Sequence, residues 1–319
     1  MIRNDGTACG RDPLVEAIAT FLARDHAFGM TGIRASLGEA IDAAGPGAID
    51  DLARRLADAG SDWSYYPRDP LARNIHRALA GRVLRHEPIV RGVEHLDLVR
   101  GKRLVIFANH LSYSDANAVD VLLQGAGATE LADRLTVIAG PKVYSNVRRR
   151  FSSLCFGTIK VPQTSARSTG EAVMNPRDVA RAARRSIEVA HERLRLGETL
   201  LVFPEGARSR SGQMQRLLSG AARYLELPDS WVLPMGLART ERLFPMSEDS
   251  LNPVRITLAI GRPVPVSRLD ERANGDRQVV MDAIGIAIAD LLPVEYRGVY
   301  GDEVACDRRA RAASQELFG

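Results

Sequence analysis

Apolar residues recur at three- and four-residue intervals through the first part of the chain. The stretches 12–26, 33–44 and 69–86 show this spacing, which places their apolar side chains on one face of an α-helix. The stretch 45–60 begins and ends with glycine, as is typical of a short helix between two breakers. The pattern therefore predicts an N-terminal helical region, which we assign to residues 1–92.

Near residue 93 the pattern changes to short apolar runs that alternate with helical periods. The apolar runs predict strands at 102–108, 134–140, 157–162, 199–206, 231–238 and 255–266. The helical periods predict helices at 115–125, 175–198 and 276–293. Such alternation is typical of an α/β domain. We expect this domain over residues 93–300, with a mostly parallel mixed sheet flanked by helices. A charged, loosely packed tail is expected at 301–319.

The composition predicts a folded protein without a membrane span. The chain has 319 residues, of which 45% are hydrophobic and 26% charged, so it can bury a large core. No run of 18 apolar residues occurs, and the N-terminus lacks the apolar core of a signal peptide. Three widely separated cysteines form neither a disulfide framework nor a metal site. The expected location is the cytoplasm, and a peripheral position on the inner face of the membrane stays open.

A net charge of +4 favours anionic partners. It does not choose between a phosphorylated metabolite, an acidic carrier protein, a membrane surface and nucleic acid. Aromatic residues make up 5% of the chain, which argues against nucleic-acid binding by base stacking. The sequence has no G-x-S-x-G elbow, no phosphate-binding loop ending in Lys-Ser or Lys-Thr, and no dinucleotide fingerprint. Its six histidines lack metal-ligand spacing, so we expect no metal ion.

A polar cluster, "NHLSYSD", follows the predicted strand at 102–108. It places His110 and Asp115 five positions apart, where the chain leaves a strand and turns into a helix. A histidine held by a carboxylate through one ring nitrogen can act as a general base through the other. The alternative is an ordinary turn in which Asp115 caps the next helix. Taken alone, this spacing favours the ordinary turn.

A second polar cluster, "VFPEGARSR", ends the predicted strand at 199–206. Arg208 and Arg210 are two residues apart, so on an extended loop their side chains share a face. Guanidinium groups match the oxygen atoms of a phosphate, although a solvated basic turn would have the same sequence. Ligands of parallel sheets bind beyond the carboxyl ends of the strands, which is where both clusters are expected.

Together the two clusters resemble the N-H-x4-D and F-P-E-G-x-R-S-R signatures of the glycerophosphate acyltransferase family. This family includes glycerol-3-phosphate and 1-acylglycerol-3-phosphate acyltransferases. The resemblance covers roughly residues 90–265 and extends to "LTVIAGPKVYSN" and "VLPMGL". It implies that His110 and Asp115 are catalytic and that the arginines bind the acceptor's phosphate. The residues it places on the acceptor side are Arg208, Arg210, Glu205 and Gly206.

The second block of this family departs from the usual pattern here. The block runs from a glycine through apolar residues to an arginine that helps to hold the acceptor. Gly157 matches the glycine, but Gln163 stands where the arginine is expected. Lys160 or Arg167 could replace it, and we include Lys160 among the acceptor-side candidates. The departure leaves the identity of the acceptor open more than the class of reaction.

The helical region in place of membrane anchors resembles the layout of soluble, plastid-type glycerol-3-phosphate acyltransferases. This likeness implies an acyl-carrier protein or acyl-CoA as donor and no bound cofactor. We expect the donor to meet basic residues after the strand at 134–140, namely Lys142, Arg148 and Arg149. A second basic set lies on the helix at 175–198 and comprises Arg177, Arg181, Arg184 and Arg185. For both sets the alternative is a solvated helix face.

The sequence thus predicts transfer of a fatty acyl group from a thioester to glycerol 3-phosphate or a related phosphorylated acceptor. One alternative is a lysophosphatidate acyltransferase, or an acyltransferase for an unusual acceptor. Another, from a different class, is a non-catalytic lipid- or phosphate-binding protein, because the second-block arginine is missing. Retention of His110 and Asp115 argues against a pure binding protein, which would not need a base.

Overall fold

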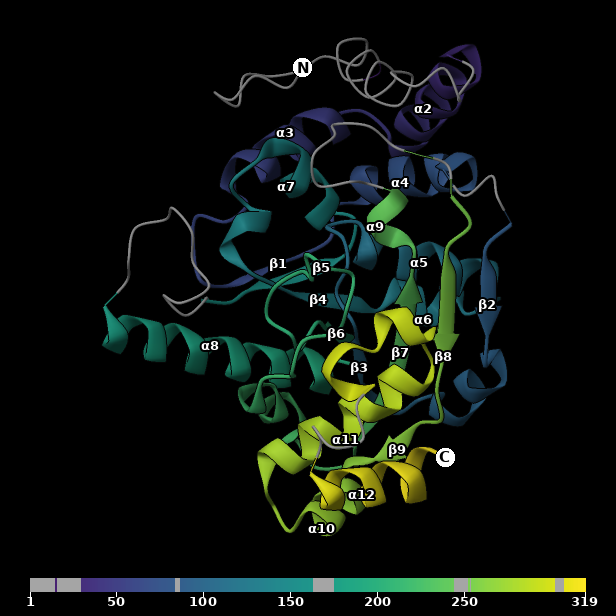
Figure 1. Ribbon diagram of the computed structural model, residues 1–319. Coiled ribbons are helices and arrows are strands. Elements are labelled where there is room, and N and C mark those ends of the chain that lie inside the picture. The colour runs from purple at the N-terminus through teal and green to yellow at the C-terminus, as the bar shows by residue number, and fades with distance from the viewer. Residues whose placement is uncertain are drawn as a thin grey trace.

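The computed structural model describes residues 15, 30–83, 87–162, 175–243, 252, 254–301 and 307–319. Of the predicted helix at 12–26, only Val15 falls within these residues. The remaining described elements form three layers, with helices on both faces of a central sheet (Figure 1).

The described part of the chain contains helices throughout its length. Those before the first long strand are α2 (Met30–Ala44), α3 (Ala48–Asp58) and α4 (Pro70–Val83). The others are α5 (Asp115–Gly125), α6 (Thr129–Asp133), α7 (Val147–Ser153), α8 (Pro176–Arg195), α9 (Thr240–Leu243), α10 (Val266–Ala273), α11 (Arg277–Asp290) and α12 (Arg308–Phe318). Short 3-10 helices are η1 (Val93–Val99), η2 (Pro141–Val143), η3 (Ser219–Leu225), η4 (Val294–Tyr296) and η5 (Gly298–Tyr300). None of the helices described is both long and apolar enough to cross a bilayer.

The sheet of the described residues has nine strands. They are β1 (Tyr65–Tyr66), β2 (Ile89–Arg91), β3 (Arg103–Ala108), β4 (Leu135–Ala139), β5 (Gly157–Lys160), β6 (Thr199–Val202), β7 (Ser230–Ala238), β8 (Thr257–Ile260) and β9 (Val264–Pro265). Their order is β1-β5-β4-β6-β3-β7-β8-β2, and β9 pairs with β7. The strands from β5 to β7 run parallel, whereas β1, β8 and β9 pair antiparallel with their neighbours β5 and β7. The predicted mostly parallel mixed sheet is confirmed.

Two parts of the sheet differ from the expectation. The N-terminal region supplies the strands β1 and β2 at the two ends of the sheet, besides its helices. The single strand predicted at 255–266 is two strands, β8 and β9, which both pair with β7. Between them, the amide of Gly261 donates to the carbonyl of Pro234 at 2.9 Å. A side chain there would meet the ring of Pro234, so the close approach requires glycine.

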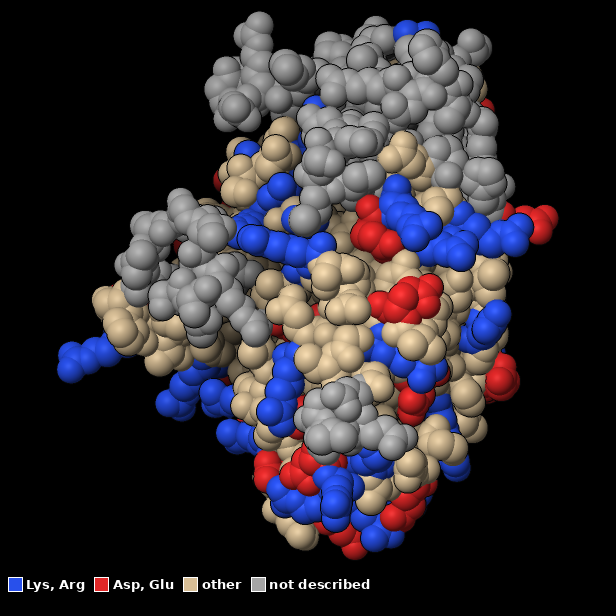
Figure 2. All heavy atoms as spheres, in the orientation of Figure 1, with Lys and Arg blue, Asp and Glu red and all other residues tan. Residues whose placement is uncertain are grey.

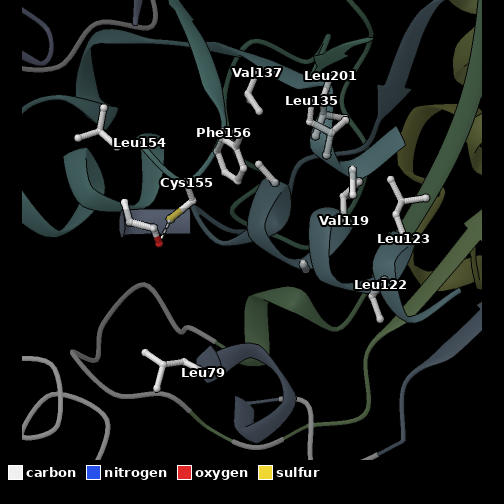
Figure 3. Close-up of a cluster of buried hydrophobic side chains, with 14 of the residues drawn as sticks. Leu79, Val119, Leu122, Leu123, Leu135, Val137, Leu154, Cys155, Phe156 and Leu201 are labelled. Carbon is white, nitrogen blue, oxygen red and sulfur yellow. Dashed lines mark hydrogen bonds between the residues drawn. The ribbon is translucent and has the colours of Figure 1, made fainter. Parts of the chain in front are cut away.

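The central strand β3 shows how the core is divided between the two faces. Successive side chains of a strand point to opposite faces. Leu104 and Ile106 accordingly join a cluster with the N-terminal helices, α5 and β4, while Val105 and Phe107 join another with α8 and α11. Figure 3 shows part of the first cluster, where side chains of α5, β4 and β6 meet. Burial of each such side chain contributes about 1.5–3 kcal/mol, so β3 is strongly anchored.

Helix α4 is joined to α5 by a buried ionic cluster. The Arg73 Nη2 atom lies 2.9 Å from an oxygen of Asp120, and the His76 Nε2 atom lies 3.1 Å from the other. Arg73 also donates to Asp133 at the end of α6. The helical region is therefore attached to the α/β domain by polar contacts as well as by the apolar core.

The C-terminal residues contradict the expectation of a loosely packed tail. Helix α12 buries Ala310, Ala313 and Leu317, and it packs against α10 and α11. These positions are spaced by three and four residues, so they form one face. The charged residues between them and the small size of alanine weakened this signal in the sequence. The first turn of α12 is capped by Asp307, whose side chain accepts a hydrogen bond from the Arg309 amide at 2.8 Å.

Candidate active site

The loop that carries His110 is fixed to β7 by the side chain of Asn109 and to the loop after β6 by the backbone of His110. Asn109 follows β3, is buried, and exchanges two hydrogen bonds with the backbone of Leu237 on β7, at 2.9 and 2.7 Å. The His110 amide donates to Glu205 at 2.8 Å, and its carbonyl accepts from the Ser209 amide at 2.8 Å. The loops after β3 and β6 are thus tied together at His110.

Asp115 is the centre of the hydrogen bonding in this loop. Its Oδ2 atom accepts from Nδ1 of His110 at 2.7 Å and from the amides of Leu111 and Ser112 at 2.7 and 2.9 Å. Its Oδ1 atom accepts from the Thr240 hydroxyl at 2.6 Å. The side chain is fully buried. A buried carboxylate with this many donors is held in one position.

The Asp115 contact decides which nitrogen of His110 can act as a base. Because a carboxylate only accepts, Nδ1 carries the proton, and Nε2 of the neutral ring keeps its lone pair. The ring also stacks on Phe203, with centroids 4.4 Å apart and an interplanar angle of 20°. Ser114, not Asp115, is the N-cap of α5, and its side chain makes no capping bond. The predicted His110–Asp115 pair therefore exists as a hydrogen-bonded unit.

Glu205 and Gly206 serve the shape of the second loop. The Glu205 side chain is fully buried, and its two oxygens accept from the amides of His110 and Gln215, at 2.8 and 2.7 Å. Gly206 has φ of 71°, a conformation that favours glycine. Both were expected on the acceptor side. The contacts of Glu205 join the two loops, and the acceptor-side role of Glu205 and Gly206 stays a prediction.

Arg208 is brought to the first loop through an aromatic ring. Its guanidinium carbon lies 3.7 Å from the ring centroid of Tyr113, three residues after His110. Arg149 of α7 lies over the same ring, at 4.0 Å. Burial and the nearby Arg149 lower the pKa of Arg208, while Tyr113 and Asp115 oppose this shift. Arg149, which was expected to contact the donor, is thereby grouped with the acceptor-side Arg208.

The other basic candidates are less closely grouped. Arg210 and Arg148 are exposed, and Lys142 is half-buried in η2. The Lys142 carbonyl accepts from a guanidinium nitrogen of Arg149 at 3.1 Å, which ties η2 to α7. Arg208 and Arg210 were expected to share a face. In the structure Arg208 is half-buried and Arg210 is exposed, with the buried Ser209 between them.

Lys160 lies at the carboxyl end of β5, on the side of β1. Its ammonium donates to the carbonyl of Gly60 at 2.7 Å and lies over the rings of Trp63 and Tyr144, 4.4 and 5.8 Å from their centroids. Strands β4 and β6 separate β5 from β3. Lys160 thus contacts the N-terminal region, and its predicted acceptor role stays a prediction. Gln163 and Arg167 lie outside the described residues.

The basic set on α8 pairs largely within its own helix. Arg181 lies 3.8 Å from Asp178, and Arg184 and Arg185 lie 3.1 and 3.8 Å from Glu188. All three arginines are exposed. This is the arrangement of a solvated helix face, with pairs three and four residues apart.

Comparison with known proteins identifies the central part of the chain. Residues 88–238 match the family model described as Acyltransferase. This segment belongs to the acyltransferase family. It spans β2 to β7 and contains His110, Asp115 and Arg208 of the two loops. Among the residues that the structure describes, no group of histidine, cysteine, aspartate or glutamate side chains could hold a metal ion.

A likeness is also found to a solved structure. The crystal structure of 1-acyl-sn-glycerophosphate acyltransferase, PlsC, from Thermotoga maritima is 20% identical in sequence and has a TM-score of 0.45. The likeness covers 88% of this chain and 97% of that chain. No curated protein gives a match.

The candidate site includes residues that the sequence analysis missed. Thr240 donates to Asp115 from the start of α9, although 125 positions separate the two residues. Phe203 supports the His110 ring, and Tyr113 joins two arginines. Phe203 and Tyr113 lie within the two polar clusters, so their position was a usable signal. Thr240 had none, because only the folding of β7 beside β3 brings it near Asp115.

Proposed function

We propose that the protein transfers an acyl group from a thioester to a hydroxyl of glycerol 3-phosphate or a related phosphorylated acceptor. One observation carries the proposal. The His110–Asp115 pair and Arg208 lie on two strand-end loops that are joined at His110 by Glu205 and Ser209. A base and a cation suited to phosphate are thus held on one frame, as transfer to a phosphorylated alcohol requires.

In the proposed reaction His110 removes the proton of the acceptor hydroxyl. Nε2 receives this proton, because Nδ1–H is bonded to Asp115, which stabilises the imidazolium. The hydroxyl oxygen attacks the carbonyl carbon of the thioester. When the tetrahedral intermediate collapses, the carbon–sulfur bond breaks and the thiolate takes the proton from Nε2. The products are an ester and a free thiol.

The oxyanion of the intermediate needs hydrogen-bond donors. The backbone amides of His110, Leu111 and Ser112 already donate to Glu205 or Asp115. These three amides therefore hold the base in position, and the oxyanion is stabilised by other groups at the strand ends. No metal ion or bound cofactor takes part in the proposed reaction.

The substrates follow from the charges around the base. Arg208 binds the phosphate of the acceptor, so that binding energy orients the hydroxyl toward His110, and the exposed Arg210 attracts the same anion. The donor is an acyl-carrier protein or acyl-CoA, and its anionic groups meet the basic surface of Lys142 and Arg148. Both donors occur in the cytoplasm, where we expect the reaction, with a lipid product released at the inner face of the membrane.

The test is release of thiol from a labelled long-chain acyl thioester by the purified protein. Two donors, acyl-CoA and acyl-carrier protein, are combined with glycerol 3-phosphate, lysophosphatidate or glycerol. The wild type is expected to release thiol and form ester with at least one phosphorylated acceptor. His110→Ala should lower turnover about 10³-fold, since general bases contribute roughly 10²–10⁴.

A matched control is His191→Ala, because His191 lies on α8 and contacts only the carbonyl of Arg223 among the described hydrogen bonds. Its turnover should stay within about twofold of the wild type. Near-normal turnover of a folded His110→Ala variant would overturn the mechanism. Ester formed only on lysophosphatidate would narrow the function to that acceptor. Binding of acyl thioester without thiol release from any acceptor would identify a non-catalytic binding protein.

A further inference from the structure

Tyr113 brings together two cations from distant parts of the sequence. The guanidinium carbons of Arg149 and Arg208 lie 4.0 and 3.7 Å from the centroid of its ring. Arg149 comes from α7, Arg208 from the loop after β6, and Tyr113 from the loop that carries His110. Both guanidinium groups therefore contact the same aromatic ring.

Two positive charges that contact the same ring repel each other unless an anion lies nearby. Both arginines are half-buried, and burial together with Arg149 lowers the pKa of Arg208. Among the described residues neither arginine forms a salt bridge with a carboxylate, whereas exposed arginines such as Arg184 and Arg272 do. Cation–π contact with Tyr113 and the negative charge of Asp115 oppose the lowering of the Arg208 pKa, which is nevertheless lowered overall.

The position of Arg149 is set by its own neighbours. One guanidinium nitrogen donates to the carbonyl of Lys142 at 3.1 Å. Helix α7 is itself fixed, because Ser152 donates to Asn117 of α5 at 2.6 Å and Arg150 donates to the carbonyl of Leu56 at 2.8 Å. The side chain is therefore preorganised toward Tyr113, which reduces the entropy lost when it binds a ligand.

We propose that Arg149 and Arg208 together bind the phosphate of the acceptor beside Tyr113, and that Arg149 determines specificity for phosphorylated acceptors. This inference rests on the proposed acyl transfer. It gives the site a second guanidinium in a chain that has Gln163 where the family pattern has an arginine. Two planar forks beside an aromatic ring match a phosphate dianion better than one cation does.

The surroundings favour the acceptor's phosphate over the surface of a carrier protein. Tyr113 is three residues from His110, so an anion at this ring lies near the base. A carrier protein would meet exposed charges, such as Arg148, the preceding residue of α7. Figure 2 shows basic side chains gathered just below the place that α7 has in Figure 1, and few acidic ones among them.

The experiment is a comparison of Arg149→Gln with the wild type in steady-state kinetics. The acceptor is varied at saturating donor, and then the donor at saturating acceptor. Arg149→Gln should raise the acceptor KM at least tenfold and leave the donor KM within about twofold. The control is Arg272→Gln, which removes an exposed arginine that pairs with Glu316 on α12, and both KM values should then stay within about twofold. A rise in the donor KM alone would overturn the proposal.

Phosphate specificity gives a second readout. The ratio of kcat/KM for a phosphorylated acceptor to that for its unphosphorylated analogue should fall at least tenfold in Arg149→Gln. Arg149→Lys should recover only part of this ratio, because an ammonium cannot stack or bind in a fork. Tyr113→Leu should raise the acceptor KM, because it removes the ring that both guanidinium groups contact. An unchanged ratio in Arg149→Gln would contradict the proposal.

Direct binding separates this inference from the proposed function. Glycerol 3-phosphate is titrated calorimetrically into the protein without donor. If the wild type binds it, and Arg149→Gln weakens binding at least tenfold while Arg272→Gln does not, the phosphate site stands even when no acceptor is acylated. Equal affinity of wild type and Arg149→Gln would reject the site, even when acyl transfer is observed.

Discussion

Helix α5 carries two histidine–aspartate pairs that differ in the partners of the carboxylate and in the ring nitrogen that each histidine uses. Asp115, the first residue of the helix, binds His110, and Asp120 binds His76 of α4. Both carboxylates are fully buried, and the histidine side chains are 18% and 12% exposed. Neither the contact distance nor the burial therefore separates a catalytic pair from a structural one.

The partners of each carboxylate make the difference. Arg73 forms a salt bridge with Asp120 and compensates its negative charge even when His76 is neutral. Gln124 also donates a hydrogen bond to Asp120. Asp115 is bonded to neutral donors apart from His110, namely two amides and the Thr240 hydroxyl. Its charge is available to an imidazolium that forms during a reaction.

The ring nitrogens differ as well. His110 uses Nδ1 toward Asp115, which leaves Nε2 at the tip of the ring. His76 uses Nε2 toward Asp120, which leaves Nδ1 beside the backbone of α4. The first pair lies at the end of a parallel strand, where ligands bind, and the second lies between two helices. A pair of this kind gains a function from orientation and setting.

The largest contrast is expected between Asp115→Asn and Asp120→Asn. Asp115→Asn should lower turnover about 10³-fold, because the amide neither fixes the His110 tautomer nor stabilises its charge. Asp120→Asn should leave turnover per folded molecule unchanged and lower the free energy of unfolding by about 3 kcal/mol, because Arg73 loses a buried partner. Thiol release and urea denaturation measure the two effects. Equal losses of turnover in Asp115→Asn and Asp120→Asn would mean that the two pairs do not differ in function.

A smaller effect on turnover is expected from Glu205→Gln, which acts on His110 through its backbone. The amide nitrogen of glutamine would face one of the two backbone N–H groups from which the carboxylate now accepts a hydrogen bond. We expect a loss of about 1–3 kcal/mol of stability and about 10²-fold in turnover. Gln124→Glu beside Asp120 is the matching change at the other pair and should affect stability alone. Full turnover by Glu205→Gln would show that the loop contact does not position the base.

Thr240→Val tests whether the far oxygen of Asp115 matters. The change keeps the shape but removes the hydroxyl that donates to Oδ1, so the carboxylate is held by one donor fewer. Turnover should fall about tenfold and stability by about 1 kcal/mol, with both recovered in Thr240→Ser. Kinetics and thermal unfolding of the three proteins give the answer. Loss of turnover in Thr240→Ser equal to that in valine would point to packing, not to the hydrogen bond.

The smallest effect concerns Asp133, which shares Arg73 with the His76 pair. Burial raises the pKa of Asp133, but hydrogen bonds from Arg73 and Arg77 outweigh this and lower it. A lowered pKa in the folded state stabilises the fold above the unfolded value of about 4, and this contribution disappears as the pH falls through the folded value. Because the side chain is half-exposed, Asp133→Asn should cost only about 0.5–1 kcal/mol at pH 7.

The same variant should cost progressively less below about pH 4. Urea denaturation of wild type and Asp133→Asn between pH 7 and pH 3 measures the difference. A difference that stays constant over this range would mean that the ionised carboxylate does not stabilise the ionic cluster. Turnover at pH 7 should be the same in both proteins, in contrast to every change around Asp115.

Much of the fold was predictable because its signals are local. The run at 103–108 is apolar and β-branched, and α5 begins at Asp115 and ends at Gly125, as the pattern predicts. The missed elements have weaker local signals. Helix α12 buries mainly alanine, and the two residues of β9 become a strand only by pairing with β7. Such short pairings depend on a neighbouring strand that is distant in sequence.

The sequence alone determined which residues we propose to carry the chemistry of the site. His110 and Asp115 are five residues apart, so a single turn can join them, and Arg208 lies in a second polar cluster that follows another strand. Only the tertiary structure decided how these groups are held and which ones meet. Thr240, Glu205 and Arg149 reach the pair or its loop from elements that the sheet and its helices bring together. Hydrogen bonds and charges act over a few ångströms, whereas the sequence separates these residues by up to 125 positions.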